Sequence, residues 1–146
     1  MANPSPELQS MAPVPLSPLA KVTLLLRVWY AAARVSVLLR RHPVGEVAAR
    51  LGVLTDRSRQ PIALLNRAVD RSLRVGSYQP RCLIRSLVLY SLLRSQGDPA
   101  ELIIGMPVVP SSSDAHSWVE LGGQDVGPLP GSRGYSELAR FPRAGS

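Results

Sequence analysis

The stretch Arg81–Gly105, RCLIRSLVLYSLLRSQGDPAELIIG, contains the change from helix to strand that decides the fold. Pro80, directly before it, is suited to the start of a helix, and Gly97 is a typical C-terminal stop. Between them apolar residues recur at helical spacing: Leu83, Leu87, Tyr90, Leu92 and Leu93. After Asp98-Pro99 the apolar run is short, as in a strand. The sequence predicts a helix that ends near Gly97 and a strand that follows it.

Helices are also predicted before this stretch. The apolar segment Val22–Leu39 is stopped by His42-Pro43, Val44–Leu51 is ended by Gly52, and a third helix begins at Pro61. The first is long enough for a membrane span, but Arg27 and Arg34 lie inside it, and each costs about 2.5–3.5 kcal/mol at a bilayer centre. We therefore predict no membrane span and a largely buried helix. The residues expected to be buried are Leu24, Leu25, Val28, Ala31, Ala32, Val35 and Leu38.

Short apolar runs continue after the first predicted strand. HSWVEL at 116–121 is one such run, and Gly122-Gly123 is a turn signal before QDV at 124–126. Helices first and strands second predict an α+β domain with a small antiparallel sheet. The proline-rich residues 1–18 are predicted to be a flexible tail, and residues 19–146 one domain, helical over about 19–97 and β-rich over about 98–146.

The composition limits the classes of function only loosely. The net charge of +7 comes almost entirely from arginine and suits nucleic acid, an anionic membrane surface or an acidic peptide. Cys82 is the single cysteine, which excludes an internal disulfide and a multi-cysteine metal site and favours a reducing compartment, the cytoplasm. The sequence contains no recognised nucleic-acid or nucleotide motif, so we predict no cofactor, no metal and no nucleic-acid partner.

Cys82 and His116 are the candidate catalytic residues. Cys82 falls in the first turn of the predicted helix, where free N–H groups and the nearby Arg81 and Arg85 favour a thiolate. His116 opens the alternating strand and is a candidate base for the thiol. Each residue also has a plainer interpretation, because a free cysteine is often a small buried hydrophobe and a histidine can simply end a strand. Trp118, which shares the face of His116, is interpreted as core packing, and a place in the wall of the cleft is the alternative.

Two blocks of the sequence stand out together: CLIRSLVLYSLLRSQGDPAELIIG at 82–105 and AHSWVE at 115–120. They closely resemble the corresponding blocks of the lasso peptide biosynthesis B2 proteins, which have a transglutaminase-like, papain-like cysteine protease fold. The likeness extends from about Leu19 to the segment 135–141. The resemblance implies that Cys82 is the nucleophile of a leader peptidase and that His116 is its general base and acid. It implies as partners the lasso precursor peptide, a separate leader-recognition protein, B1, and the lasso cyclase.

The remaining site residues are less well defined. The backbone N–H of Cys82 is a candidate oxyanion donor, with Gln79 or Tyr78 as a second donor. The family usually has an acidic residue twelve positions after the histidine, where this chain has Pro128. Two other acids remain candidates for the third triad member. The alternative is a Cys–His dyad without an acid, in which a backbone carbonyl orients the imidazole.

Asp114 and Asp125 are those two acids. Asp114 lies two residues before His116, roughly 7 Å away on the same face of an extended strand. In a regular two-residue hairpin Asp125 pairs with Glu120, roughly 13 Å along the strand from His116. Asp125 is therefore expected to reach the imidazole only if the hairpin contains a bulge.

Three other functions are compatible with the sequence. A non-catalytic scaffold would bind the precursor and keep Cys82 as a core residue. A transglutaminase-like enzyme would use the same residues to transfer an acyl group to an amine in place of water. A basic nucleic-acid-binding protein is supported only by the sequence pI near 10.7.

Overall fold

The computed structural model describes residues 17–53, 60–74, 82–109, 115–126 and 134–142. Within these ranges helices come first and strands second, so the α+β class and the small antiparallel sheet are confirmed. The division into a tail and a domain stays a prediction. The elements are α1 (Pro18–Arg41), α2 (Val44–Leu51), α3 (Ile62–Leu73), α4 (Cys82–Ser95), β1 (Glu101–Pro107), β2 (His116–Leu121), β3 (Gln124–Asp125) and β4 (Tyr135–Phe141).

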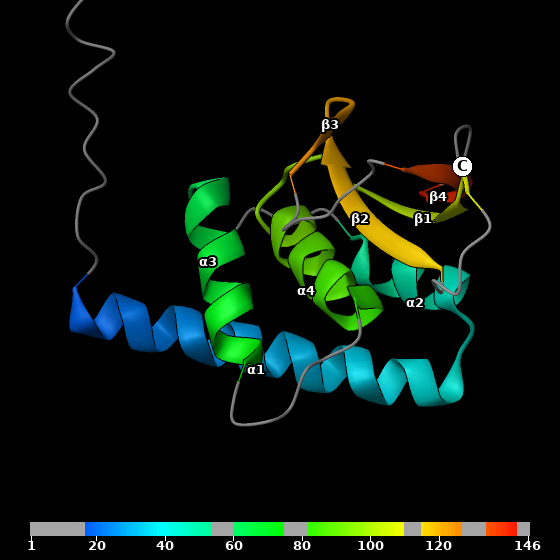
Figure 1. Ribbon diagram of the computed structural model, residues 1–146. Coiled ribbons are helices and arrows are strands. Elements are labelled where there is room, and N and C mark those ends of the chain that lie inside the picture. Colours follow the sequence, from blue (N-terminus) through cyan, green and yellow to red (C-terminus); the bar gives the residue numbers. More distant parts are fainter. Residues whose placement is uncertain (1–16, 54–59, 75–81, 110–114, 127–133, 143–146) are drawn as a thin grey trace, which may run out of the picture.

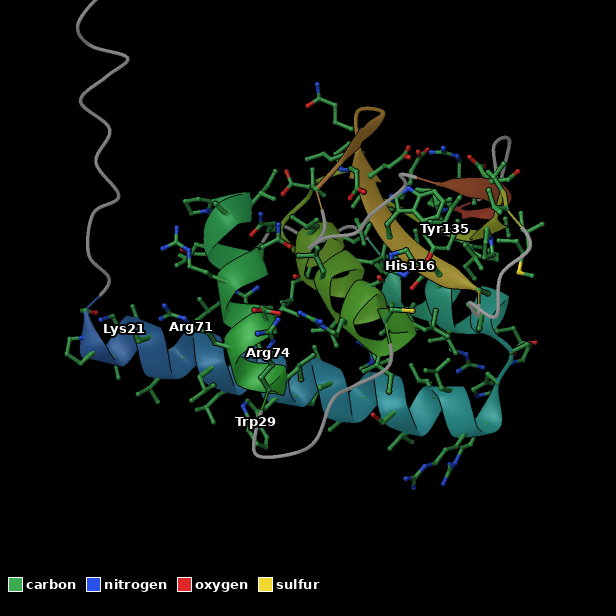
Figure 2. The ribbon with its side chains drawn as sticks, viewed as in Figure 1. Lys21, Trp29, Arg71, Arg74, His116 and Tyr135 are labelled. Atoms are coloured by element: carbon green, nitrogen blue, oxygen red, sulfur yellow. The ribbon has the colours of Figure 1, made fainter. Side chains whose placement is uncertain are left out.

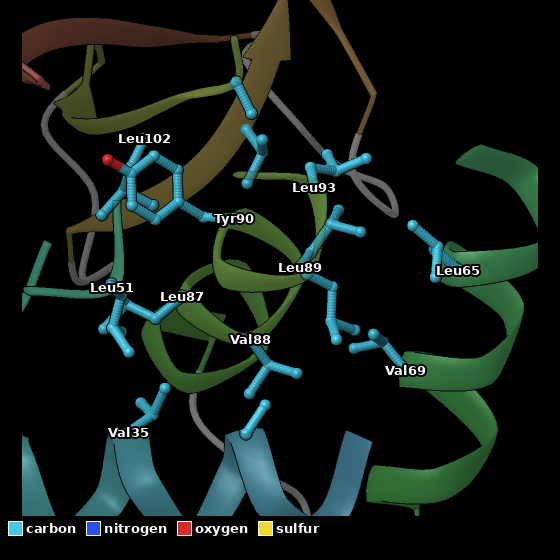
Figure 3. Packing of buried hydrophobic residues seen from close by; sticks show 14 of the residues in the cluster. Val35, Leu51, Leu65, Val69, Leu87, Val88, Leu89, Tyr90, Leu93 and Leu102 are labelled. Atoms are coloured by element: carbon cyan, nitrogen blue, oxygen red, sulfur yellow. The ribbon is translucent and has the colours of Figure 1, made fainter. Parts of the chain in front are cut away.

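Helix α4 lies at the centre of the molecule. Its middle is buried on nearly every side, because α1, α2 and α3 pack around it and the sheet covers it from above (Figure 1). The close view shows side chains from all of these elements meeting around Leu87, Leu89 and Leu93 (Figure 3). Burial of apolar surface contributes about 25 cal/mol for each Å². Since α4 contacts the other three helices and the sheet, it forms the centre of the core. Gly97 has φ +92°, a conformation that glycine adopts readily, and it follows the end of the helix as predicted.

The sheet has the strand order β3-β2-β1-β4, with antiparallel pairing throughout. Gly122 and Gly123 form the two-residue turn between β2 and β3, and Glu120 pairs with Asp125, as expected for a regular hairpin. Leu102 and Val119, which pair across β1 and β2, face the helices and belong to the core around α4. Their neighbours along the strands, Ile103 and Trp118, are buried on the opposite face.

The prediction that the first helix is largely buried was wrong. Leu24, Val28, Ala31 and Val35 form a narrow buried stripe, but Leu25 is 43% exposed and much of the remaining apolar surface faces solvent. The reason is that α2, α3 and α4 all contact α1 from one side, and no other element of the described segments covers its opposite side (Figure 1). By length and composition α1 is also the one helix of the described segments that could cross a membrane.

Strand β4 was not predicted as an element of its own. It pairs with β1 at the edge of the sheet opposite β3, and the register shifts between Ile104 and Gly105. Arg140 of β4 forms ion pairs with Glu101, Glu120 and Glu137. Their carboxylates hold the pKa of the Arg140 guanidinium well above its usual range, so its charge is permanent. Charge pairing across three strands thus helps to fix β4, which the hydrophobic pattern alone did not reveal.

Candidate active site

Cys82 is the first residue of α4, and its thiol lies beside the start of β2. The Sγ atom is 4.0 Å from the carbonyl oxygen of Ala115, the residue that precedes His116. Cys82 is half-buried, unlike a core cysteine. Because the first N–H groups of a helix have no partner within the helix, the start of α4 at Cys82 also has a partial positive charge. The fold therefore brings the thiol and the segment that carries His116 together from distant parts of the sequence.

One turn further along, two serines fix the helix to the same strand. Ser86 Oγ donates to the carbonyl oxygen of Ser117 at 3.1 Å, and Ser117 Oγ donates to Ser86 Oγ at 3.2 Å. Both side chains are buried. Since Cys82 and Ser86 are four residues apart, they lie on the same face of α4. These two hydrogen bonds between Ser86 and Ser117 thus fix the first half of α4 against β2.

His116 lies in an aromatic environment on the other face of the sheet from Ser117. Its ring centroid is 4.9 Å from that of Tyr135 and 6.3 Å from that of Trp118 (Figure 2). The prediction that Trp118 shares the face of His116 and is buried was correct. Because His116 is the first residue of β2, its ring lies at the end of the sheet nearest the start of α4.

Tyr135 was missed by the sequence reasoning. It is the first residue of β4, and it pairs with Pro107 at the far end of β1. Its ring covers the His116 imidazole from the neighbouring edge of the sheet. YSELARF at 135–141 does not alternate strictly between apolar and polar residues, so hydrophobic periodicity gives no clear strand signal there.

Gly105 leaves the space that Trp118 needs. Gly105 pairs with His116 across β1 and β2. A Cβ atom at this position would lie 2.8 Å from the Trp118 ring and 2.8 Å from the carbonyl oxygen of Ser136. Both contacts are too short, and one of them involves the backbone of β4. The glycine thus allows Trp118 to cross β1 beside the imidazole.

Burial lowers the pKa of the His116 imidazole below its usual range, and the negative charge of Asp125 partly opposes this shift. Nε2 of His116 is buried and has no hydrogen-bond partner within the described segments. The hairpin that carries Asp125 is regular, so the condition under which we expected it to act on the imidazole, a bulge, is absent. Its charge nevertheless acts on His116, because electrostatic interactions in a partly buried site extend beyond hydrogen-bond distance. Asp125 is thus the acid of the described segments whose charge the structure couples to the histidine.

We expect Asp125→Asn to lower the pKa of His116 further, since the change removes the charge that favours the imidazolium. Proton NMR of the imidazole in a Cys82→Ala background measures this pKa without interference from the thiol, and His42→Gln assigns the signals. Glu137→Gln on β4 is the matched control and leaves the titration unchanged. A pKa that rises in Asp125→Asn would contradict the electrostatic interpretation. Because the folded pKa lies below the unfolded value, the free energy of unfolding falls as the pH drops from about 6.5 towards the folded pKa.

Several predicted site residues lie outside the described residues: Gln79, Tyr78, Asp114, Pro128 and Arg81. Arg85, the other cation expected to favour the thiolate, forms an ion pair with Asp70 of α3. Asp70 also pairs with Arg74 at 3.3 Å. Arg85 thus helps to join α3 to α4, and part of its charge is compensated there. Among the described residues no group of three or more His, Cys, Asp and Glu side chains is placed to hold a metal ion.

The arrangement provides the elements of thiol chemistry. A half-buried thiol at a helix start lies next to the segment that carries an imidazole, and that imidazole is held largely neutral by burial. A neutral imidazole accepts a proton, and the free N–H groups of a helix start stabilise negative charge. A thiol, a neutral imidazole and a helix start are the chemical elements that attack on a carbonyl carbon uses.

Comparison with known proteins gives one match. The family model described as the transglutaminase-like superfamily matches residues 23–140. This range contains α2, α3, α4, β1, β2 and β3 completely and most of α1 and β4. No curated protein and no solved structure matches the chain.

Proposed function

Because this chain belongs to the transglutaminase-like superfamily, we propose that it is a cysteine peptidase that removes the leader from a lasso peptide precursor. Family membership supports a cysteine-protease-like or acyltransferase-like function. The resemblance of the two blocks at 82–105 and 115–120 to the B2 proteins supports the narrower activity. The observation that carries the proposal is the 4.0 Å approach of the Cys82 thiol to the residue before His116.

In the proposed reaction His116 accepts the proton of the Cys82 thiol, and the thiolate attacks the carbonyl carbon at the junction of leader and core. The tetrahedral intermediate collapses as the C–N bond breaks, and the imidazolium of His116 gives its proton to the leaving amine. A thioester between Cys82 and the leader remains. His116 then takes a proton from water, the hydroxide attacks the thioester, and the leader leaves as a carboxylate while the thiol is restored. The backbone N–H of Cys82 donates a hydrogen bond to the oxyanion, and Gln79 or Tyr78 is the second donor.

The third member of the site is assigned to Asp125 in this proposal. Its charge raises the pKa of His116, which stabilises the imidazolium that forms during attack. Asp114 remains the alternative, since it precedes His116 by two residues. Asp125 acts here through its charge and is thus a positioning residue.

The proposal includes partners and a compartment. B1 binds the leader and delivers the precursor, and the cyclase joins the new N-terminal amine to a side-chain carboxylate. The exposed arginines of the helices give a positive surface that suits an acidic leader or an acidic face of B1. The single cysteine, which must stay reduced to act, supports the cytoplasm as the place of the reaction.

The experiment that tests this function identifies the product. The protein is incubated with a candidate precursor and B1, with and without a small primary amine, and the peptides are analysed by mass spectrometry. We expect the free leader carboxylate and the intact core peptide, in the same amounts with and without amine. A leader amide as the main product would show that the protein is an acyl transferase and not a peptidase. Binding of the precursor without either product would favour the scaffold.

A further inference from the structure

Helix α1 carries a second apolar stripe on the face opposite to the one that packs into the core. The most exposed members of this stripe are Leu19 at 77%, Tyr30 at 69% and Leu26 at 64%. At 3.6 residues per turn, the stripe lies about half a turn from the buried stripe. Its six large members are Leu19, Val22, Leu26, Trp29, Tyr30 and Val37. Figure 2 shows Trp29 pointing away from α3 and α4.

The charges of α1 are all positive. The helix contains Lys21 and four arginines, and it has no aspartate or glutamate. Lys21, Arg34, Arg40 and Arg41 are exposed. An isologous contact between two copies of this stripe would bring cations of the same sign together without any acid on the helix to offset them. The stripe therefore fits an anionic partner better than a second copy of the chain.

We propose that this stripe docks α1 on the surface of an anionic lipid bilayer, with the helix lying in the plane of the interface. Trp29 and Tyr30 are the residue types that favour the boundary between headgroups and acyl chains. Leu19, Val22, Leu26 and Val37 supply the apolar contact, and the basic residues bind lipid phosphates. The chemical class of the ligand is the anionic phospholipid headgroup together with its acyl region.

The packing of α1 distinguishes lying on a membrane from crossing it. Leu24, Val28, Ala31 and Val35 are buried in the core that α1 shares with its neighbouring helices. Crossing the bilayer would remove these side chains from that core and would carry Arg27 and Arg34 into the apolar interior. A helix that lies on the membrane surface keeps these side chains in the core and keeps Arg27 and Arg34 out of the apolar interior.

Docking in this way leaves the candidate active site accessible. The sheet lies on the side of α4 opposite to α1, so a membrane below α1 would not reach His116 (Figures 1 and 2). The two surfaces are therefore separate, and the docking proposal does not depend on the proposed peptidase function. Variants on α1 therefore test membrane docking without changing the candidate active site.

Co-sedimentation with vesicles tests the proposal on the full chain. Vesicles of phosphatidylcholine with 30% phosphatidylglycerol are compared with vesicles of pure phosphatidylcholine at about 0.1 M salt. We expect binding to the anionic vesicles, at least tenfold weaker binding to the neutral ones, and a further decrease as salt rises. Quenching of tryptophan fluorescence by lipids brominated on the acyl chains is expected in the wild type and lost in Trp29→Phe, which leaves the buried Trp118 as the only tryptophan.

Two variants and one control make the test specific. Leu26→Glu combined with Trp29→Glu removes apolar contact and adds negative charge, so it abolishes sedimentation. Arg40→Gln combined with Arg41→Gln weakens binding about thirtyfold and leaves the apolar stripe in place. Leu138→Glu replaces a leucine of the same 64% exposure on β4 and leaves binding unchanged. Circular dichroism checks that each variant is folded.

Either of two results would overturn the proposal. The first is that the folded wild type stays in the supernatant with anionic vesicles at low salt. The second is a dimer in sedimentation velocity that Leu26→Glu with Trp29→Glu dissociates, in the absence of vesicle binding. That second outcome would assign the stripe to self-association.

Discussion

We expect Cys82→Ala to lower the rate of leader cleavage at least a thousandfold, with binding of the precursor retained. Removing the nucleophile eliminates the thioester route, and the loss of a catalytic nucleophile typically costs several orders of magnitude in rate. Cys82 is half-buried at the start of α4, so the smaller alanine side chain fits without crowding its neighbours. The rate is measured by following the precursor with mass spectrometry in the presence of B1.

The matched control is Ser91→Ala, which shortens a side chain on the same helix nine residues further along and retains the wild-type rate. His116→Ala is expected to lower the rate about 10²- to 10⁴-fold, as for the loss of a general acid and base. In the proposed mechanism the thiol and the imidazole act as a unit, so the double variant should be about as slow as Cys82→Ala alone. Cleavage by Cys82→Ala within tenfold of the wild type would contradict a thiol mechanism.

The second large effect is on stability. We expect Leu87→Ala to reduce the free energy of unfolding by about 2–5 kcal/mol, the usual range for a buried leucine replaced by alanine. Leu87 is fully buried on α4, where side chains of several elements meet, so the substitution removes apolar contact and leaves a cavity (Figure 3). Urea denaturation followed by circular dichroism measures the difference.

Leu138→Ala is the matched control, since it makes the same chemical change at a residue that is 64% exposed on β4. Its effect should stay within about 0.5 kcal/mol. If the two variants lost equal stability, α4 would not be the centre of the core. An unchanged m-value in both confirms that the comparison concerns stability and not a change in the denatured state.

The central helix and the hairpin could be predicted from the sequence because short-range patterns determine them. The apolar spacing in α4 and the stop at Gly97 depend on neighbouring residues, and so does the turn at Gly122-Gly123. The alternation in β2 likewise placed His116 and Trp118 on one face. These features need no knowledge of which elements meet in space.

Features that depend on the neighbours of an element could not be predicted in the same way. The apolar composition of α1 is the same whether a second layer covers its outer face or not, so the pattern overestimated its burial. The place of β4 beside β1 depends on long-range pairing, and Tyr135 became visible as a neighbour of His116 only with that pairing. The coupling of Asp125 to His116 is likewise a property of the partly buried site and not of strand spacing alone.

The roles of the site residues differ in how far the structure supports them. The position of Cys82 beside the segment that begins β2 follows from packing between α4 and the sheet. The chemical roles of Cys82 and His116 stay predictions, which kinetics test. The choice between Asp114 and Asp125 is also a prediction, which titration tests. The same holds for Gln79 and Tyr78 as oxyanion donors.

The measurement that tests the central claim most directly is rapid acid quenching of the protein during turnover of the precursor with B1, followed by peptide mass spectrometry of the protein. A thioester to Cys82 is stable in acid, so the peptide that contains Cys82 should gain the mass of the leader less one water. We predict this adduct in the wild type and its absence in Cys82→Ala, together with loss of cleavage. Cleavage by Cys82→Ala at the wild-type rate, with no adduct on Cys82 in the wild type, would contradict the account.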